Sequence, residues 1–256
     1  MNKLFNPLPL LLAVLLLFSC GEKAEDFSPA AQVKDYFPVQ IGKSITYRID
    51  STVFVRSGSA VEKHQYQVKH SITDTTRDNQ KRLTYIVQRQ IRNADGSGNW
   101  TDNGRYYITP LDNSVEVVED NLRVIKITGP MLAGNTWKGN TYLPLSPYEA
   151  AFGTQAGSEM NTWVFTHKGL LGSETVQGQQ YSNVWTIEQA NTVRNLPPPA
   201  TNPGYGSMEV SSEKYSKGIG LVYRNYQIYD FQPPNQGVPQ GTYAGFGITM
   251  WMIDHH

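Results

Sequence analysis

The chain has 256 residues, and its 22 Lys and Arg side chains balance its 22 Asp and Glu side chains. This balance excludes the basic excess that a nucleic-acid-binding surface requires, so we expect no nucleic-acid partner. The content of 15 Tyr, 9 Phe, 5 Trp, 22 Gly and 15 Pro is typical of a β-protein with many turns.

Residues 1–19 have the features of a secretory signal peptide. Lys3 supplies a positive charge, and the apolar run that follows has about ten residues, too few for a membrane-spanning helix. The run ends in Leu17-Phe18-Ser19-Cys20, which resembles the lipobox of bacterial lipoproteins, although Phe18 replaces the small or aliphatic residue usual there. The resemblance implies cleavage before Cys20 and acylation of its thiol. The alternative is an ordinary secretion signal that leaves a free thiol.

The segment 20–35 is predicted to be a lipidated tether. Lipoproteins of this type carry three acyl chains, of the palmitate kind, and two or more chains give stable membrane attachment. Gly21 stands where an inner-membrane retention signal would have Asp, which implies sorting to the outer membrane. The acidic cluster at 22–26 indicates either surface exposure or a merely solvated tether. The membrane, contacted through this anchor, is the expected partner.

Residues 36–256 are predicted to form a single β domain. Ser44–Val55 alternates apolar and polar residues as a half-buried strand does, and a turn follows at 56–59. Strands at Tyr66–Ile72 and Lys81–Arg92 continue a meander into a Gly-rich turn. Further strands are predicted at Arg105–Thr109, Ser114–Glu119, Leu122–Thr128, Thr162–His167, Val184–Arg194, Met208–Tyr215, Leu221–Phe231 and Gly247–Ile253.

The one helical signal lies in a long insertion at 140–160. Ser146-Pro147-Tyr148-Glu149 reads as a capping box, with Ser146 as N-cap and Glu149 at the third helical position, and predicts a short helix. Gly218 and Gly220 are predicted to form the turn between two later strands, with at least one of them at positive φ.

Motifs for catalysis or metal binding are scarce. Acylation of Cys20, the only Cys in the chain, would leave no thiol, and no G-x-S-x-G or H-E-x-x-H sequence occurs. His64 and His70 share one strand face but lie about 20 Å apart, too far to bind one metal ion. The turn at 95–99 resembles the start of a calcium loop, with a plain hairpin turn as the alternative. Asp254-His255-His256 at the terminus is a weak metal motif, and a frayed end is the alternative. We therefore assign no metal and no cofactor.

Leu221–Phe231 carries apolar side chains on both faces. Tyr226 and Ile228 lie on one parity, and Tyr223 and Tyr229 on the other. Such a strand is covered on both sides, either by ordinary packing of Tyr in a sheet or by a ligand such as a lipid or glycan in an aromatic groove.

Two segments resemble secreted bacterial lipoproteins that have no established activity. Tyr36-Phe37-Pro38 with Gly42 and Tyr47 is similar to their opening motif, and Tyr215–Tyr223, with its Gly-Ile-Gly turn, is similar to a motif near their C-terminus. The resemblance implies a curved antiparallel sheet similar to the half-barrels of lipoprotein carriers. It assigns no catalytic residues.

The sequence thus predicts an all-β fold, a curved antiparallel sheet that forms a barrel or half-barrel, with a two-sheet sandwich as the alternative. The expected function is a non-enzymatic binding or accessory module, lipid-anchored at the outer membrane on its periplasmic or cell-surface side. One alternative is a carrier whose concave face holds a lipid or other hydrophobic ligand. The other is a hydrolase built from dispersed carboxylates such as Asp74, Asp78, Glu119 and Asp120. The ligand-binding residues stay unassigned.

Overall fold

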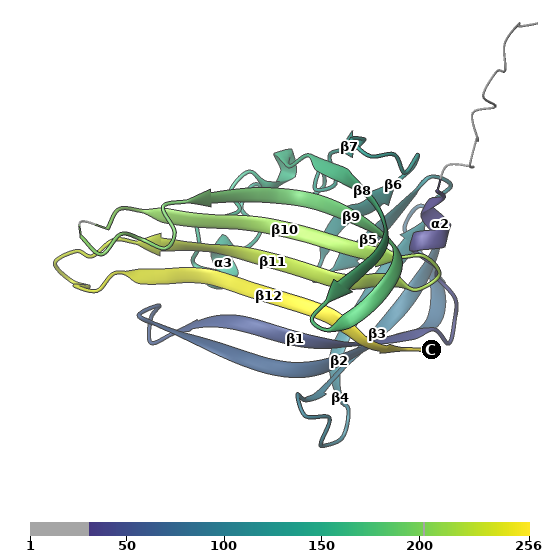
Figure 1. Ribbon diagram of the computed structural model, residues 1–256, viewed down its shortest axis with the longest axis horizontal. Helices are drawn as coiled ribbons and strands as arrows, with labels where there is room; N and C mark the ends of the chain where they lie inside the picture. The colour runs from purple at the N-terminus through teal and green to yellow at the C-terminus, as the bar shows by residue number, and fades with distance from the viewer. Residues whose placement is uncertain (1–30, 202) are drawn as a thin grey trace, which may run out of the picture.

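The computed structural model describes residues 31–201 and 203–256, which form one strongly curved antiparallel sheet (Figure 1). Its order is β6-β5-β4-β3-β2-β1-β12-β11-β10-β9-β8-β7. The strands are β1 (Ser44–Val55), β2 (Ala60–Arg77), β3 (Leu83–Asn93), β4 (Thr101–Pro110), β5 (Ser114–Glu119), β6 (Leu122–Thr128), β7 (Thr136–Trp137), β8 (Phe165–Val176), β9 (Gln179–Arg194), β10 (Gly206–Ser216), β11 (Gly220–Gln232) and β12 (Thr242–His255).

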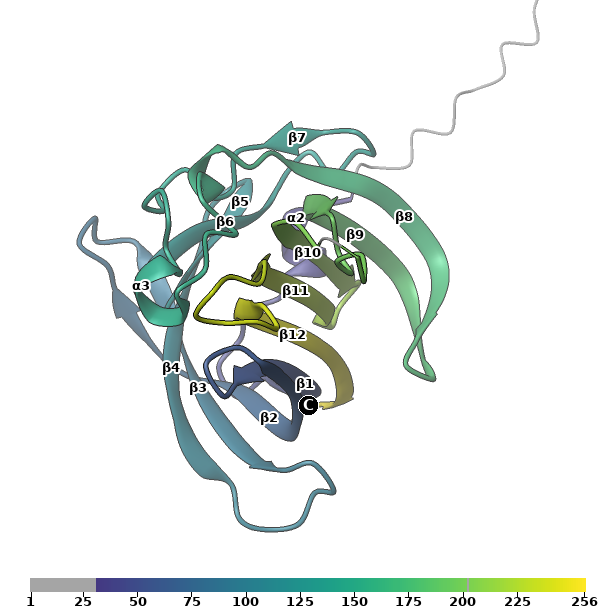
Figure 2. The same ribbon diagram turned by 90° about the vertical axis from the view of Figure 1, so that its left-hand side faces the viewer.

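The sheet consists of two meanders joined where the first and last strands pair, so that Ile49 lies opposite Met250. Figure 2 shows the strands curving around a common interior. The two sheet edges approach each other: the backbone N–H of Ile125 donates to the carbonyl of Gly139 at 2.8 Å, and the indole of Trp137 donates to the carbonyl of Ile125 at 2.9 Å. The sheet is therefore a nearly closed barrel. The predicted fold is confirmed, and the sandwich alternative is wrong because all the strands belong to one sheet.

The predicted strands are present, and several of them, most of all β8, extend beyond their predicted bounds. β8 begins at Phe165 and continues to Val176, whereas the sequence predicted a strand at Thr162–His167. Residues 160–162 instead form a 3-10 helix, η2 (Met160–Thr162). The extension was missed because exposed side chains predominate in its outer part, which removes the apolar alternation. The two-residue strand β7 is too short to produce a pattern.

The short helix predicted in the insertion is present as α3 (Glu149–Phe152). Its predicted capping box is wrong, because the N-cap is Tyr148 and no side chain caps the helix. Ser146 contributes only its backbone carbonyl, which accepts from the N–H of Glu149 at 3.4 Å. The helix is a single turn that begins two residues later than the capping box requires.

The chain enters the barrel through a second short helix, α2 (Val33–Tyr36). Its first three residues fall in the segment that the sequence assigned to the tether. Val33 and Tyr36 are only 7% and 2% exposed and pack against the core, while Lys34 is exposed. Apolar side chains at both ends of one helical turn explain why this segment docks on the sheet.

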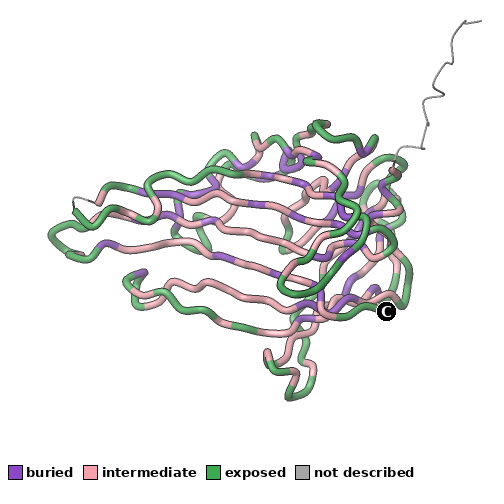
Figure 3. Tube along the Cα trace, viewed as in Figure 1, coloured by how far each residue is buried: buried purple, intermediate pink, exposed green. Residues whose placement is uncertain are grey.

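Buried side chains concentrate in the half of the barrel that carries α2 (Figure 3). Two apolar clusters fill this half. The first contains Val33, Tyr36, Ile72, Val87, Ile108, Val115, Val117, Ile127, Met131, Phe165, Trp185, Ile187 and Tyr215, and the second contains Ile45, Tyr47, Val68, Tyr181, Val184, Val222, Met250 and Met252. This packed end makes a rigid base for the opposite half.

The turn between β10 and β11 confirms a sequence prediction. Gly218 and Gly220 both have positive φ, 77° and 108°. The N–H of Gly218 donates to the carbonyl of Asp35 at 2.7 Å, which ties the turn to α2. The turn sets the register of β10 against β11 and so places Glu213 opposite Arg224.

Candidate functional site: an interior cavity

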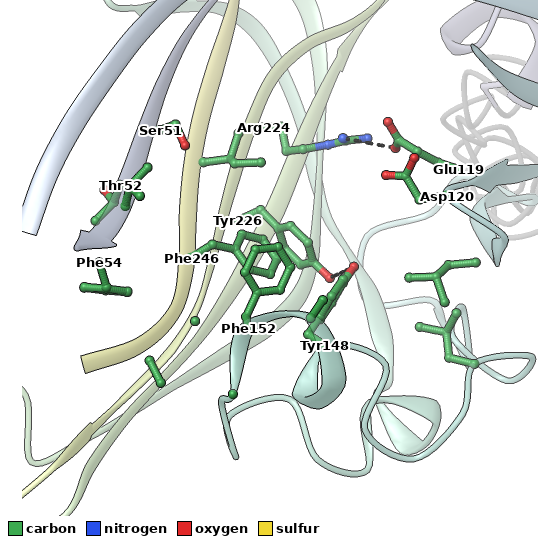
Figure 4. Close-up of a pocket in the computed structure, with 18 of the residues that line it drawn as sticks. Ser51, Thr52, Phe54, Glu119, Asp120, Tyr148, Phe152, Arg224, Tyr226 and Phe246 are labelled. Carbon is green, nitrogen blue, oxygen red and sulfur yellow. Dashed lines mark hydrogen bonds and ion pairs between the residues drawn. The ribbon is translucent and has the colours of Figure 1, made fainter. Parts of the chain in front are cut away.

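A cavity of about 800 Å³ occupies the less densely packed half of the barrel. Its walls come from β1, β11 and β12 on one side and from the insertion that carries α3 on the other (Figure 4). The volume falls in the range of about 300–1,000 Å³ that is common for small-molecule sites. The sheet alone would leave this side of the barrel open, so the insertion completes the cavity.

The wall beside α3 is an aromatic cluster of Tyr148, Phe152, Tyr226 and Phe246. The Phe246 ring lies 4.7 Å from the Phe152 ring and 5.0 Å from the Tyr148 ring, centroid to centroid. The Tyr226 hydroxyl donates to the Tyr148 hydroxyl at 2.9 Å. Figure 4 shows these rings gathered against one another. The cluster gives the cavity an apolar surface suited to a hydrocarbon chain.

The insertion is fixed to the sheet by a buried carboxylate. Asp230 on β11 is fully buried, and its Oδ2 accepts from the Thr154 hydroxyl at 2.6 Å and from the backbone N–H groups of Gln155 and Ala156 at 2.6 and 3.2 Å. Glu209 on β10 accepts from the N–H of Gly157 at 3.0 Å. These bonds hold the chain after α3 in one position over the cavity.

The cavity floor is charged, and its centre is Glu213. This carboxylate is 1% exposed. It accepts four hydrogen bonds, from Lys126 Nζ at 2.7 Å, Arg224 Nε at 2.8 Å, the Tyr215 hydroxyl at 2.7 Å and Gln189 Nε2 at 3.0 Å. Burial alone would raise the pKa of Glu213, but Lys126 and Arg224 lower it to about 2. Glu213 is therefore an anion that anchors two cations.

Three further charges extend the floor toward the cavity mouth. Arg89 donates to Glu119 at 2.8 Å and to Asp120 at 3.1 Å, and Arg224 Nη1 lies 3.6 Å from Glu119. Burial opposes ionisation of Glu119, but Arg224 and Lys126 outweigh it, so its pKa is lowered. The pKa of Lys126 is lowered because its burial outweighs the attraction of Glu213.

A second hollow of about 70 Å³ lies on the core side of the floor, and Glu119, Lys126 and Arg224 line both spaces. His70 faces this smaller hollow, with its ring between Tyr47 and Tyr106. Burial lowers the pKa of His70 to about 4, so the ring is neutral at physiological pH. The charged layer thus separates the cavity from the apolar core.

The other residues weighed from the sequence lie apart from the cavity. His64 pairs with Glu62 on β2 at 2.9 Å. Asp95 closes its own turn by accepting from the N–H of Ser97 at 2.9 Å. In the two described ranges no three His, Cys, Asp or Glu side chains are grouped to hold a metal ion. Cys20 lies outside the described residues.

Of the four carboxylates considered for a hydrolase, Glu119 and Asp120 line the cavity, whereas Asp74 and Asp78 do not. Asp78 binds Arg82, with Nε to Oδ2 at 2.6 Å, and closes the β2–β3 turn.

For the aromatic side chains of β11, the sequence left two alternatives, an aromatic groove for a ligand and ordinary packing in the sheet. The structure contains an example of each position. Tyr226 lines the cavity, whereas Tyr229 packs against Phe54 with ring centroids 5.2 Å apart.

Sequence reasoning missed Arg224, Glu213 and Lys126 as site residues. A charged residue that faces a barrel interior alternates along its strand just as a solvent-facing one does, so its pattern is ambiguous. One signal was present: the predicted turn at Gly218 and Gly220 brings Glu213 and Arg224 opposite each other on paired strands. Opposite charges at such a pair of positions indicate an ion pair.

None of the helices in the described ranges is long and apolar enough to cross a membrane. No protein-family model and no curated protein matches the chain. Among solved structures, a protein described as exported, with a YmcC-like fold, from Bacteroides fragilis and a protein described as a lipoprotein from Parabacteroides distasonis each have 10% identity and a TM-score of 0.35. Each alignment covers 86% of this chain and 98% of the other.

A domain described as an outer membrane lipoprotein-sorting protein domain from Vibrio parahaemolyticus aligns with 11% identity and a TM-score of 0.20. The alignment covers 87% of this chain and 88% of that one. At these scores the likenesses carry no argument about function. The family resemblance of the two sequence motifs therefore stays a prediction.

Proposed function

We propose that this protein is a lipid-anchored extracytoplasmic protein that binds a hydrophobic ligand, such as an acyl chain, in the cavity between the barrel and the α3 insertion. The observation that carries the proposal is the cavity of about 800 Å³ with its wall of Tyr148, Phe152, Tyr226 and Phe246. A concave apolar site of this size favours a carrier or ligand-binding protein over a module that binds through a flat surface.

The electrostatics of the floor favour binding over hydrolysis. A glycosidase-type mechanism needs a carboxyl group with a raised pKa that serves as general acid. Glu119 and Glu213 have lowered pKa values, because Arg224 and Lys126 stabilise both as anions. The hydrogen bonds of Glu213 to four donors fit a structural role, in which the carboxylate fixes the shape of the site.

The signal and lipobox motifs support the proposed location. An outer-membrane anchor at Cys20 would keep the barrel beside a membrane, which is a source of acyl chains. The tether and the cavity therefore agree in the kind of ligand that they indicate.

The proposal is tested with an environment-sensitive naphthylamine dye that fluoresces in apolar sites. We expect saturable binding of about one dye per chain, and displacement by a fatty acid. Ala244→Phe fills the cavity from β12 without removing a contact, and we expect it to weaken dye binding by about tenfold, equivalent to about 1.4 kcal/mol.

Thr249→Phe is the matched control, since Thr249 is on the same strand but on its opposite face and does not line the cavity. Its affinity for the dye should equal that of the wild type. Absence of saturable binding to the wild type, or equal losses in the two variants, would refute a ligand site in this cavity.

A further inference from the structure

The floor of the cavity contains equal numbers of positive and negative side chains. The cations are Arg89, Lys126 and Arg224, and the anions are Glu119, Asp120 and Glu213. A ligand that brought a net charge into this enclosed space would unbalance the set, and uncompensated charge in a poorly solvated site is costly. The polar end of a bound amphiphile should therefore carry no net charge.

The floor nevertheless offers hydrogen-bond donors that the protein leaves unused. Arg224 donates through Nε to Glu213. Its Nη1 atom lies 3.6 Å from Oε2 of Glu119, which is beyond hydrogen-bonding distance. Its terminal N–H groups make no hydrogen bond within residues 31–201 and 203–256. The side chain is 19% exposed and reaches the cavity (Figure 4). Arg224 is thus prepared to bind an anionic oxygen of a ligand.

Carboxylate oxygens with unused acceptor capacity lie beside the guanidinium of Arg224. Asp120 is 71% exposed and accepts one bond, from Arg89, while Glu119 is 27% exposed. Figure 4 shows both carboxylates facing the end of the Arg224 side chain. A cationic or N–H-bearing group beside Glu119 and Asp120 would use these acceptors.

We propose that the cavity selects amphiphiles with a zwitterionic head group, whose anionic part binds Arg224 and whose cationic part binds Glu119 and Asp120. This inference rests on the proposed function and deepens it, because the aromatic wall supplies the contact for the apolar chain. A purely anionic head group would meet the repulsion of the two carboxylates. An uncharged head group would leave the terminal N–H groups of Arg224 and the exposed oxygens of Asp120 without a charged partner.

The test compares three single-chain lipids with the same acyl chain and glycerol unit: lysophosphatidylethanolamine, lysophosphatidic acid and monoacylglycerol. Only the first is zwitterionic; the second is anionic and the third is uncharged. Each is used below its micelle-forming concentration to displace the naphthylamine dye from the full chain. We expect lysophosphatidylethanolamine to bind about tenfold more tightly than either of the others, equivalent to about 1.4 kcal/mol.

Asp120→Asn then removes one exposed carboxylate from the site. We expect it to weaken lysophosphatidylethanolamine and strengthen lysophosphatidic acid, so that the ratio of their dissociation constants changes by about fivefold, within the range of a partly exposed ion pair. Asp112→Asn, at an exposed carboxylate outside the cavity, should leave the ratio unchanged. Both positions are exposed, so neither change threatens folding.

The outcomes separate the two proposals. If no lipid displaces the dye, the ligand-binding function itself is wrong. If all three lipids bind with equal affinity, the cavity binds hydrophobic ligands but the selection for a zwitterion is wrong. If the preference exists but Asp120→Asn and Asp112→Asn alter it equally, the assignment to this floor is wrong. A preference that only Asp120→Asn reduces supports the inference.

Discussion

At the scale of single residues, Glu213 determines the electrostatics of the interior. Its negative charge balances the positive charges of Lys126 and Arg224, which are both largely buried. Removing one partner from a buried ionic group typically costs about 3–5 kcal/mol, because the charges left behind have no compensation. We expect Glu213→Gln to lower the free energy of unfolding by about this amount at pH 7, measured by urea denaturation. Glu188→Gln, in the half-exposed pair with Lys168, should cost less than about 1 kcal/mol.

The pH dependence of stability provides an independent check on Glu213. Its pKa is about 2 in the folded chain and 4.5 in the absence of structure, so the unfolded state binds the proton more readily. The stabilisation is therefore complete above about pH 4.5 and is lost as the pH falls toward 2. The difference in the free energy of unfolding between wild type and Glu213→Gln should decrease as the pH falls from 6 to 3. A difference that does not change with pH would contradict the lowered pKa of Glu213.

At the scale of elements, the insertion that carries α3 depends on Asp230. Oδ2 of this carboxylate accepts hydrogen bonds from three consecutive residues of the insertion, and each hydrogen bond to a charged group contributes about 1.5–3 kcal/mol. We expect Asp230→Ala to release residues 153–157 from the sheet, seen as faster amide hydrogen exchange there while β10 and β11 stay protected. Asp50→Ala, which removes an exposed hydrogen bond between β1 and Gln65 of β2, is the control. Equal exchange in both variants would show that Asp230 does not hold the insertion.

Some of these elements could be predicted from the sequence, and others could not. Alternation identified β1, and the Gly218 turn was correct because positive φ strongly favours glycine. The capping box failed because this one-turn helix, which packs against Phe246, is positioned by its aromatic contacts and by its C-cap Gly153, not by an N-cap side chain. The clamp at Asp230 and the ion pair of Glu213 with Lys126 join residues distant in sequence, so no local pattern reveals them.

At the scale of the whole molecule, the barrel has two halves with different roles. The half that carries α2 is packed with apolar side chains, and the other encloses the cavity. The charged floor lies between them and is held by partners from β3, β5, β6, β10 and β11. A floor assembled from strands far apart in sequence forms only when the whole sheet has closed. Ligand binding and complete folding should therefore be coupled.

At the same scale, we expect attachment of the molecule to a membrane to depend on Cys20. Cys20 precedes the described residues, within which Val33 is the first buried apolar residue. Acylation contributes about 0.8 kcal/mol per buried methylene, so loss of the acyl chains removes essentially all of the anchoring free energy. We expect Cys20→Ala to move the protein from the membrane fraction to the soluble fraction with an unchanged circular dichroism spectrum. Gly21→Asp, which keeps the proposed acylation site at Cys20, should stay in the membrane fraction. A Cys20→Ala variant that stays with the membrane would mean that another part of the chain makes the attachment.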